Sequence, residues 1–143
     1  MAFDNILVVC VGNICRSPIA AALLKDQYPQ KNIDSAGLSA MTGHPVEPKS
    51  QQVMAPYNLD VSDHVAKQIN ENLVTIADLI FTMSDSQTKW IEARWPHCRG
   101  KTFRIGHWIN KDIADPYQRD VSAFETAYKD IVNSLEQWAD KLS

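Results

Sequence analysis

Residues 5–17 read NILVVCVGNICRS, and the order of residue types in this stretch gives the clearest indication of the fold. Positions 6–9 form an apolar run of branched residues with the length of a buried strand, and Cys10 follows it directly. After Arg16 the pattern becomes helical, with apolar residues at positions 19–24. We expect Ser17 to cap this helix and Pro18 to occupy its first position. The stretch therefore predicts a strand, a short loop and a helix in succession.

A loop that connects a strand to a helix N-terminus is suited to bind an anion, because backbone N–H groups of the loop and of the first helical turn converge on its centre. Gly12 lets the backbone adopt conformations that a side chain would penalise. Cys10 would lie at the base of the loop as a thiolate nucleophile, and the planar fork of Arg16 matches two phosphate oxygens. The predicted phosphate-binding loop consists of Val11, Gly12, Asn13, Ile14, Cys15, Arg16 and Ser17.

The spacing of Cys10 and Arg16 is a weak motif by itself, since a chain with three cysteines and five arginines can contain it by chance. The alternative interpretation is a buried cysteine at a strand end and a surface arginine that caps a neighbouring element. The strand before, the glycine within, and the Ser-Pro pair and helix after the loop favour the phosphate-binding interpretation.

Four segments of the sequence are similar to those of one enzyme family. CVGNICRS (10–17) follows the first predicted strand, and DSAG (34–37), HVAKQI (64–69) and DPY (115–117) fall in the family's order and spacing. Over nearly its whole length the chain resembles the low-molecular-weight protein tyrosine phosphatases. The resemblance implies hydrolysis of phosphotyrosine through a phosphocysteine intermediate, with no cofactor and no metal, and with inorganic phosphate or vanadate as inhibitors.

Composition and length are typical of one globular domain spanning residues 1–143. The net charge of −3 gives no field that would recruit nucleic acid. We expect no membrane insertion and no signal peptide, because no apolar run is long enough. Three cysteines, an odd number, argue against a disulfide scaffold and suit a reducing compartment. The sequence thus predicts a cytoplasmic protein, which we expect to be a monomer.

Strands alternate with helices along the chain, which predicts parallel βαβ units. We expect an α/β three-layer sandwich in which helices cover both faces of a four-stranded parallel sheet. The predicted strands are 6–9, 32–37, 78–83 and 101–105, and the predicted helices begin at Pro18 and span 49–57, 71–76, 85–95 and 121–142. Ser84 or Asp85 should cap the fourth helix, and a capping box of Ser122 and Glu125 should begin the last one.

A phenolate leaving group needs a proton, and Asp115 is the candidate general acid. Pro116 fixes its own φ and biases Asp115 to an extended conformation, so the Asp-Pro-Tyr segment holds this carboxyl group rigidly within a long loop. An ordinary turn aspartate is the alternative, and the resemblance favours the acid. The resemblance also implies that Tyr117 forms one wall of the substrate cleft and stacks on the substrate ring.

Eukaryotic-like members of the family carry an aromatic residue after the DSAG segment, where this chain offers Leu38, Met41 and His44 as the other wall. This departure resembles the bacterial branch that acts on autophosphorylated tyrosine kinases of capsule or exopolysaccharide export. A kinase of this class is the expected protein partner. Where the family has an acidic residue after Met83, this chain has Ser84.

The resemblance further implies a supporting hydrogen-bond network of Asn13, Ser17, Ser35 and His64. Asn13 should hold a strained backbone conformation, which asparagine tolerates. Ser17 should donate to the Cys10 thiolate, and His64 should fasten Asn13. His97 and His107 are assigned to the surface or to packing.

Cys15 lies in the same loop as Cys10, so a disulfide between them could protect the nucleophile from overoxidation, while a small buried hydrophobe is the alternative. An arsenate reductase would need two further cysteines, and only Cys98 lies outside the loop. A phosphate-binding module would need neither Cys10 nor Asp115. A phosphocysteine carrier would not need the Asp-Pro-Tyr segment.

Overall fold

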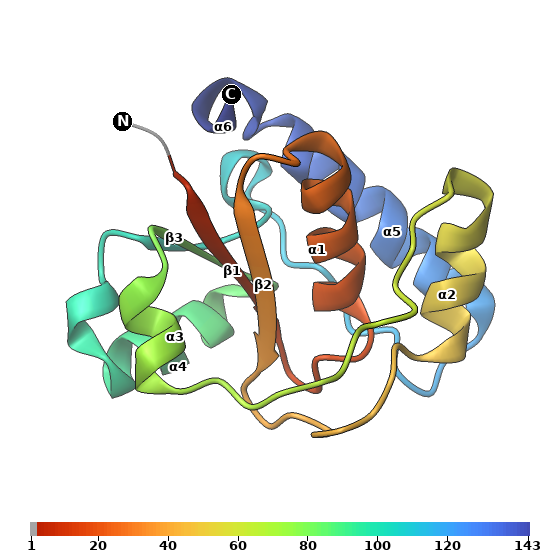
Figure 1. The fold of residues 1–143 in the computed structure, drawn as a ribbon, viewed down its shortest axis with the longest axis horizontal. Helices are drawn as coiled ribbons and strands as arrows, with labels where there is room; N and C mark the ends of the chain where they lie inside the picture. The colour runs from red at the N-terminus through yellow and green to blue at the C-terminus, as the bar shows by residue number, and fades with distance from the viewer. Residues whose placement is uncertain (1–2) are drawn as a thin grey trace.

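Four parallel strands form an open sheet in the order β2-β1-β3-β4, with β1 in a central position (Figure 1). The strands span Asn5–Cys10 (β1), Asn32–Gly37 (β2), Leu79–Thr82 (β3) and Thr102–Arg104 (β4). The computed structural model describes residues 3–143. Ile6 to Cys10 are all buried, as expected for a strand covered on both faces. The predicted four-stranded parallel sheet is confirmed.

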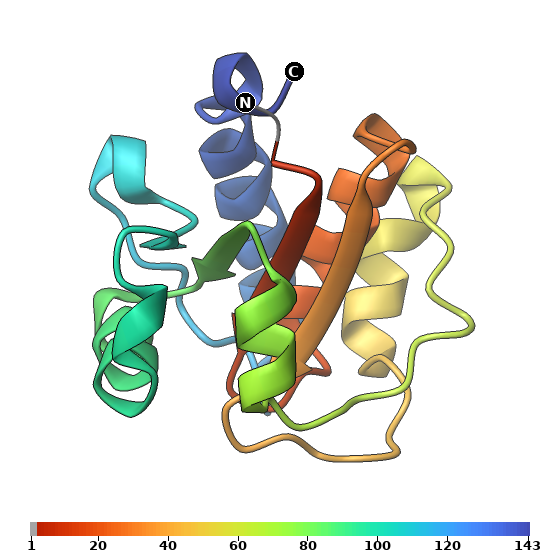
Figure 2. The same ribbon diagram turned by 60° about the vertical axis from the view of Figure 1, so that its left-hand side comes forward.

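Helices cover both faces of this sheet, so the predicted three-layer sandwich is also confirmed. The helices α1 (Arg16–Gln27), α2 (Pro48–Met54) and α5 (Val121–Glu136) pack over Ile6 and Val8 of β1. The helices α3 (Glu71–Ile76) and α4 (Asp85–Arg94) pack over Leu7 and Val9 on the opposite face. Figures 1 and 2 show α3 and α4, in green to teal, on the other side of the strands from α1 and α2.

The sheet places the C-terminal end of β1 at a topological switch point. After β1 the chain turns through α1 to β2 on one side, and later returns to β3 on the other side of β1. In such folds ligands bind beyond the carboxyl ends of the strands where the order reverses. Cys10 and the loop after it occupy this position.

Several predicted element ends were wrong for identifiable reasons. Helix α1 begins at Arg16 rather than at Pro18, and Ser17 is not its cap. The helix predicted to run to Tyr57 ends at Met54 and continues as a 3₁₀ helix, Ala55–Tyr57, which Asn58 terminates in a left-handed conformation.

Ser84 is the N-cap of α4, as one of the two predicted candidates. Its hydroxyl accepts from the Gln87 amide at 3.3 Å.

The last predicted helix is divided in two. After α5 the chain turns at Gln137 and Trp138, and a short α6 follows (Ala139–Leu142). The indole of Trp138 donates to the carbonyl of Ile105 at 2.9 Å, which draws the chain toward the sheet. The predicted capping box is also wrong, because Asp120 is the N-cap and Ser122 donates to its carboxylate instead.

Candidate active site

The loop between β1 and α1 is a cradle whose floor is Cys10. Asn13 has a left-handed backbone with a φ of 61°, which folds the loop back on itself. Cys15 is the N-cap of α1 and makes no capping hydrogen bond from its side chain. The first N–H groups of the helix are therefore not satisfied by a cap side chain and are available to an anion in the loop.

Asn13 is fully buried, and its side-chain amide, its side-chain oxygen and its backbone carbonyl all form hydrogen bonds. Its side-chain amide donates to the hydroxyls of Ser17 at 2.8 Å and Ser35 at 3.0 Å, and its side-chain oxygen accepts from the Lys67 backbone amide at 3.0 Å. Nε2 of His64 donates to the Asn13 carbonyl at 2.7 Å. These contacts hold the strained backbone of the loop in place. They bring together the four residues of the predicted network and add the backbone of Lys67, which the sequence could not indicate.

Ser17 lies against the sulfur of Cys10, with 3.0 Å between Oγ and Sγ. The Ser17 oxygen already accepts from Asn13, so its own proton is free to point at the sulfur. A hydroxyl donor at this distance stabilises a thiolate. These two contacts explain why Ser17 does not cap α1, since they engage its hydroxyl within the loop.

Arg16 points back into the cradle and is only 3% exposed. Its Nη1 donates to the carbonyl of Ile113 at 2.7 Å, and its Nη2 lies 3.7 Å from a carboxylate oxygen of Asp115. Its Nε is buried and finds no hydrogen-bond partner among residues 3–143. An orphaned buried donor is costly, so the pair formed by Nε and Nη2 is an open fork that an oxyanion would satisfy.

Asp115 is held beside this fork with its side chain 48% exposed. Its carboxylate accepts from the Tyr117 amide at 3.1 Å, a local turn that Pro116 stiffens. The preceding Ile113 is buried, and its amide donates to the Met83 carbonyl at 2.8 Å while its carbonyl binds Arg16. Ile113 thus ties the loop of Asp115 to the residue that follows β3 and to Arg16 in the cradle. Sequence reasoning missed Ile113 because it acts only through its backbone.

The other two aspartates of this region are engaged elsewhere. A hydrogen bond from Arg104, at 2.8 Å, lowers the pKa of Asp112, whose carboxylate also accepts from the Asp85 amide at 3.1 Å. A hydrogen bond from Ser122 lowers the pKa of Asp120. Only Asp115 of the three is paired with Arg16 across the cradle.

A pocket of about 110 Å³ opens above the sulfur of Cys10, and its side walls are Met41 and Tyr117. Ser39 also lines it, whereas Leu38 and His44 do not, so the predicted cleft was partly wrong. The lining consists of Cys10, Val11, Gly12, Ile14, Cys15, Arg16, Ser39, Met41, Asp115 and Tyr117.

The wall after β2 is positioned by backbone pairing with the cradle. The amides of Leu38, Ser39 and Met41 donate to the carbonyls of Cys10, Val11 and Gly12, each at 3.0 Å. Leu38 then packs its side chain against the core on the α3 and α4 face, and His44 is turned out to solvent. A Cβ on Gly37 would meet the Val11 carbonyl at 2.6 Å, so only glycine allows this close approach.

Cys15 is buried beside Cys10, and neither is in a disulfide. Burial is the main cause that raises the pKa of the Cys15 thiol to about 12, and the nearby Cys10 adds to it. Cys15 is therefore a protonated thiol at neutral pH. Over residues 3–143 no group of three or more His, Cys, Asp or Glu side chains converges as metal ligands would. None of the helices in this range is long and apolar enough to cross a membrane.

His64 makes stability depend on pH. Burial lowers its pKa below the ordinary 6.5, outweighing the hydrogen bond to the Asn13 carbonyl, which raises it. Below about pH 6.5 the unfolded chain therefore binds a proton more readily than the folded one. The free energy of unfolding consequently decreases as the pH is lowered below this value. Urea titrations from about pH 7.5 to about pH 5 should show this loss in the wild type and a smaller one in His64→Gln. The exposed His44→Gln variant is the control, and an equal slope in all three proteins would refute the assignment.

Comparison with known proteins gives one consistent result. Residues 5–143 match the family model described as low molecular weight phosphotyrosine protein phosphatase. The chain is 50% identical over 138 residues to the low molecular weight protein-tyrosine-phosphatase Ptp of Acinetobacter johnsonii, covering 96% of this chain and 97% of that protein. The crystal structure of the Erwinia amylovora tyrosine phosphatase AmsI has a TM-score of 0.94 and 40% identity, covering 99% and 94% of the two chains. The tyrosine phosphatase Wzb from Escherichia coli K30, solved with sulfate, has a TM-score of 0.94 and 37% identity, covering 99% of each.

Proposed function

Because the chain belongs to the low molecular weight phosphotyrosine protein phosphatase family, we propose that it hydrolyses phosphotyrosine in proteins through a phosphocysteine at Cys10. The observation that carries the proposal is the open fork of Arg16. Its buried Nε has no hydrogen-bond partner within residues 3–143, its Nη2 faces Asp115, and the cradle beneath it ends in the Cys10 sulfur. A nucleophile, an oxyanion site and an acid thus face one small pocket.

In the first step the phosphoryl oxygens bind the backbone N–H groups of residues 11–17 and the Arg16 fork. The Cys10 thiolate attacks phosphorus, and the bond between phosphorus and the tyrosine oxygen breaks. Asp115, protonated in the reactive complex, gives its proton to that oxygen, so tyrosine leaves as the neutral phenol. The Ser17 hydroxyl stabilises the sulfur while it is a thiolate.

In the second step a water molecule attacks the phosphorus of phosphocysteine, and the Asp115 carboxylate takes a proton from this water. The sulfur–phosphorus bond breaks and returns Cys10 as a thiolate, again with Ser17 as its donor. Inorganic phosphate is released. Phosphate and vanadate should compete with substrate, because both present oxyanions to the same cradle.

Phosphotyrosine suits the shape of the site, because its ring would lie between Tyr117 and Met41. Met41 provides an aliphatic wall where eukaryotic-like members of the family carry an aromatic residue. This difference supports a substrate of the bacterial branch, an autophosphorylated tyrosine kinase of capsule or exopolysaccharide export. We propose that the reaction takes place in the cytoplasm, where reducing conditions keep the sulfur of Cys10 out of disulfides.

The proposed function is tested by comparing a phosphotyrosine peptide with its phosphoserine and phosphothreonine counterparts, with and without chelator. We expect the phosphotyrosine peptide to be hydrolysed with a kcat/KM at least about 10² higher, because only an aryl ring reaches between the walls. Chelator should change nothing. Binding of the phosphotyrosine peptide without release of phosphate would instead identify a binding module.

Oxidation should inactivate the protein reversibly. Peroxide oxidises the Cys10 thiolate to a sulfenic acid, and the Cys15 thiolate then attacks that sulfur, forming a disulfide and expelling hydroxide, which takes a proton from solvent. Because the pKa of Cys15 is near 12, this closing step should accelerate about tenfold per pH unit around neutrality.

Peptide mapping after mild peroxide treatment should show a bond between Cys10 and Cys15, and a thiol reductant should restore the activity. Cys98→Ser is the matched control and should behave as wild type. Equal recovery of the Cys15→Ser variant would show that Cys15 has no protective role.

A further inference from the structure

The wall after β2, residues 37–44, lies between the cradle and residues 64–69. Backbone hydrogen bonds tie both ends of the wall to residues 64–69. Gly37 forms two of these bonds, each of 2.9 Å, and the amide of Gly43 donates to the carbonyl of Ala66 at 2.9 Å. These bonds fix the two ends of the wall, so other contacts must hold its middle against the cradle.

The side chain of Gln68 reaches the middle of the wall. Its Nε2 donates to the carbonyl of Leu38 at 2.7 Å, and its Oε1 accepts from the amide of Ala40 at 2.8 Å. A strand residue in a parallel ladder makes the same two bonds to the residues on either side of its partner. The carboxamide of Gln68 therefore pairs with Ser39 as a backbone peptide group would, two positions beyond the bridge between Gln68 and Gly37. We call this pair of bonds the Gln68 clasp.

The clasp completes the hydrogen bonding of the wall. The amides of Leu38, Ser39 and Met41 donate to carbonyls of the cradle, whereas the amide of Ala40 faces away from the cradle toward Gln68. The wall is therefore bonded on both sides at Ser39. Ser39 and Met41 line the active-site pocket, and Gln68 is an exposed residue outside its lining. Gln68 can thus act on the pocket through the wall that it holds.

The chemistry of the clasp requires a carboxamide. Glutamine carries a donor and an acceptor on one planar group, which matches a carbonyl and an amide two residues apart. A methionine side chain of nearly the same length and shape would form neither bond. Because backbone bonds hold both ends of the wall, loss of the clasp should loosen the middle of the wall and leave the fold intact.

We propose that Gln68 is a positioning residue for substrate recognition, which holds Ser39 and Met41 in place as the wall that receives the aromatic ring. The proposal rests on the proposed function, in which the ring lies between Met41 and Tyr117. A wall that is already ordered loses little freedom when a ligand binds, so it adds to the affinity for the ring. The phosphoryl group binds the cradle instead. Loss of the clasp should therefore weaken the binding of ligands that carry a ring and spare the binding of inorganic phosphate.

The test compares benzylphosphonate, which carries a ring, with inorganic phosphate, which does not. Each is titrated into the full-length protein and followed by backbone amide NMR, so the result does not depend on turnover. In Gln68→Met we expect the Kd of benzylphosphonate to rise about fivefold and the Kd of phosphate to stay within about twofold of the wild type. The KM for a phosphotyrosine peptide should rise about fivefold with kcat within about twofold. Gln68→Ala is a second variant that should show the same split.

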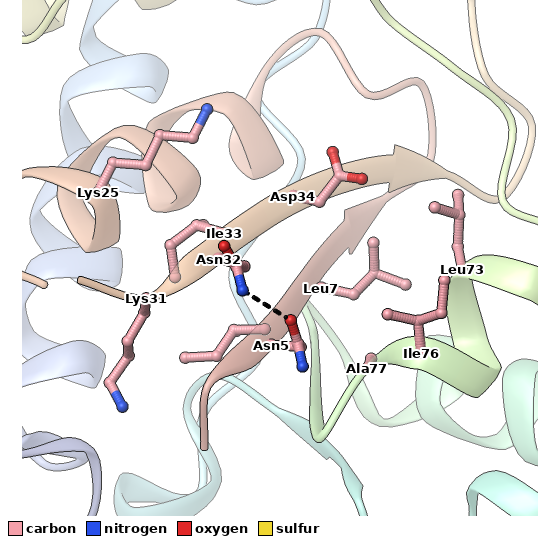
Figure 3. A pocket seen from close by; sticks show the side chains of 11 residues that line it. Asn5, Leu7, Lys25, Lys31, Asn32, Ile33, Asp34, Leu73, Ile76 and Ala77 are labelled. Atoms are coloured by element: carbon pink, nitrogen blue, oxygen red, sulfur yellow. Dashed lines mark hydrogen bonds between the residues drawn. The ribbon is translucent and has the colours of Figure 1, made fainter. Parts of the chain in front are cut away.

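Asn32→Leu is the matched control. Figure 3 shows that the exposed carboxamide of Asn32 also forms a hydrogen bond, here to the carboxamide of Asn5 at 3.0 Å. This bond borders a pocket of about 530 Å³. Asn32 lies at the N-terminal end of β2, five residues before Gly37, which is about 16 Å along a strand. The control also replaces a bonded carboxamide by an apolar side chain of similar size, and it should leave both Kd values and the KM unaltered.

A double-mutant cycle with Met41→Ala distinguishes positioning of the wall from a general loss of structure. If Gln68 acts through the wall, Gln68→Met should change the Kd of benzylphosphonate little further once Met41 is truncated. The proposal is overturned if the two effects are additive, if Gln68→Met weakens both ligands alike or neither, or if the wild type binds neither ligand. A protein that shows the expected split in Kd but hydrolyses no phosphotyrosine would contradict the proposed function and support the role of Gln68.

Discussion

Replacing Cys10 by serine is expected to lower kcat for phosphotyrosine by more than about 10⁴-fold. A serine hydroxyl is protonated at neutral pH and is a far weaker nucleophile than a thiolate. The Ser17 hydroxyl, which lies against the sulfur and accepts from Asn13, offers no comparable activation to a neutral serine hydroxyl at position 10. The measurement is steady-state release of phosphate from a phosphotyrosine peptide, with the wild type assayed at the same time.

Substrate binding should survive this substitution, because the Arg16 fork and the backbone N–H groups of the loop remain in place. Binding of vanadate or of the peptide, measured by calorimetry, should therefore change by less than about tenfold. Cys15→Ser and Cys98→Ser are matched controls that also remove a buried thiol, and both should retain turnover. A Cys10→Ser variant that kept a tenth of the wild-type rate would refute the assignment of the nucleophile.

Replacing Asp115 by asparagine is expected to lower the rate by about 10² to 10⁴ for phosphotyrosine and phenyl phosphate, whose leaving groups are basic. The penalty should be smaller for p-nitrophenyl phosphate and nearly absent for aryl phosphates of still more acidic phenols, which leave without a proton. The KM should change less than kcat, because Asp115 lies outside the proposed phosphate-binding loop, residues 10–17. The measurement is kcat across a series of aryl phosphates in both proteins, with chemistry rate-limiting.

Asp112→Asn and Asp120→Asn are the controls, since the same change is made in the same region at carboxylates engaged by Arg104 and Ser122. Neither should steepen the dependence of rate on leaving-group pKa. If the Asp115→Asn slope were no steeper than that of the wild type, Asp115 would not be the general acid.

The part of the candidate site that is contiguous in sequence could be recognised because it follows local rules. Residues 10–17 combine a cysteine, a glycine-containing loop and a helix start within eight positions, and Asp115 belongs to a short rigid segment. The contacts that close the site could not be predicted in the same way. The Ile113 carbonyl on Arg16 and the Lys67 amide on Asn13 are backbone groups, which any residue type could supply.

The fold was predicted more completely than its element ends, for a related reason. The apolar pattern of β1 and the alternation of strands and helices require a parallel sheet covered on both sides. The ends of helices depend on which of several neighbouring groups a side chain binds. Ser17 fits the local rule for a helix cap, yet Cys10 and Asn13 engage its hydroxyl. Trp138 fits the apolar stripe of the last helix, yet its bond to Ile105 accompanies the turn after α5.

The segment after β2, which lines one side of the pocket, shows that the direction of a side chain within the site also could not be predicted. Leu38, Met41 and His44 were chosen because they follow Gly37, but sequence distance does not give the direction in which each side chain points. The backbone pairs of this segment with Cys10, Val11 and Gly12 decide that Met41 and Ser39 face the pocket.

The covalent phosphocysteine proposed at Cys10 can be detected by trapping it during turnover. Wild-type protein in excess over p-nitrophenyl phosphate is quenched during a single turnover and digested, and the peptides are mapped by mass spectrometry. We expect one transient phosphoryl group, attached to the sulfur of Cys10 in the peptide that contains this residue, and we expect it to disappear as inorganic phosphate is released. Release of p-nitrophenol at the full rate with no phosphorylated Cys10 at any time, or with the phosphoryl group on another residue, would contradict it.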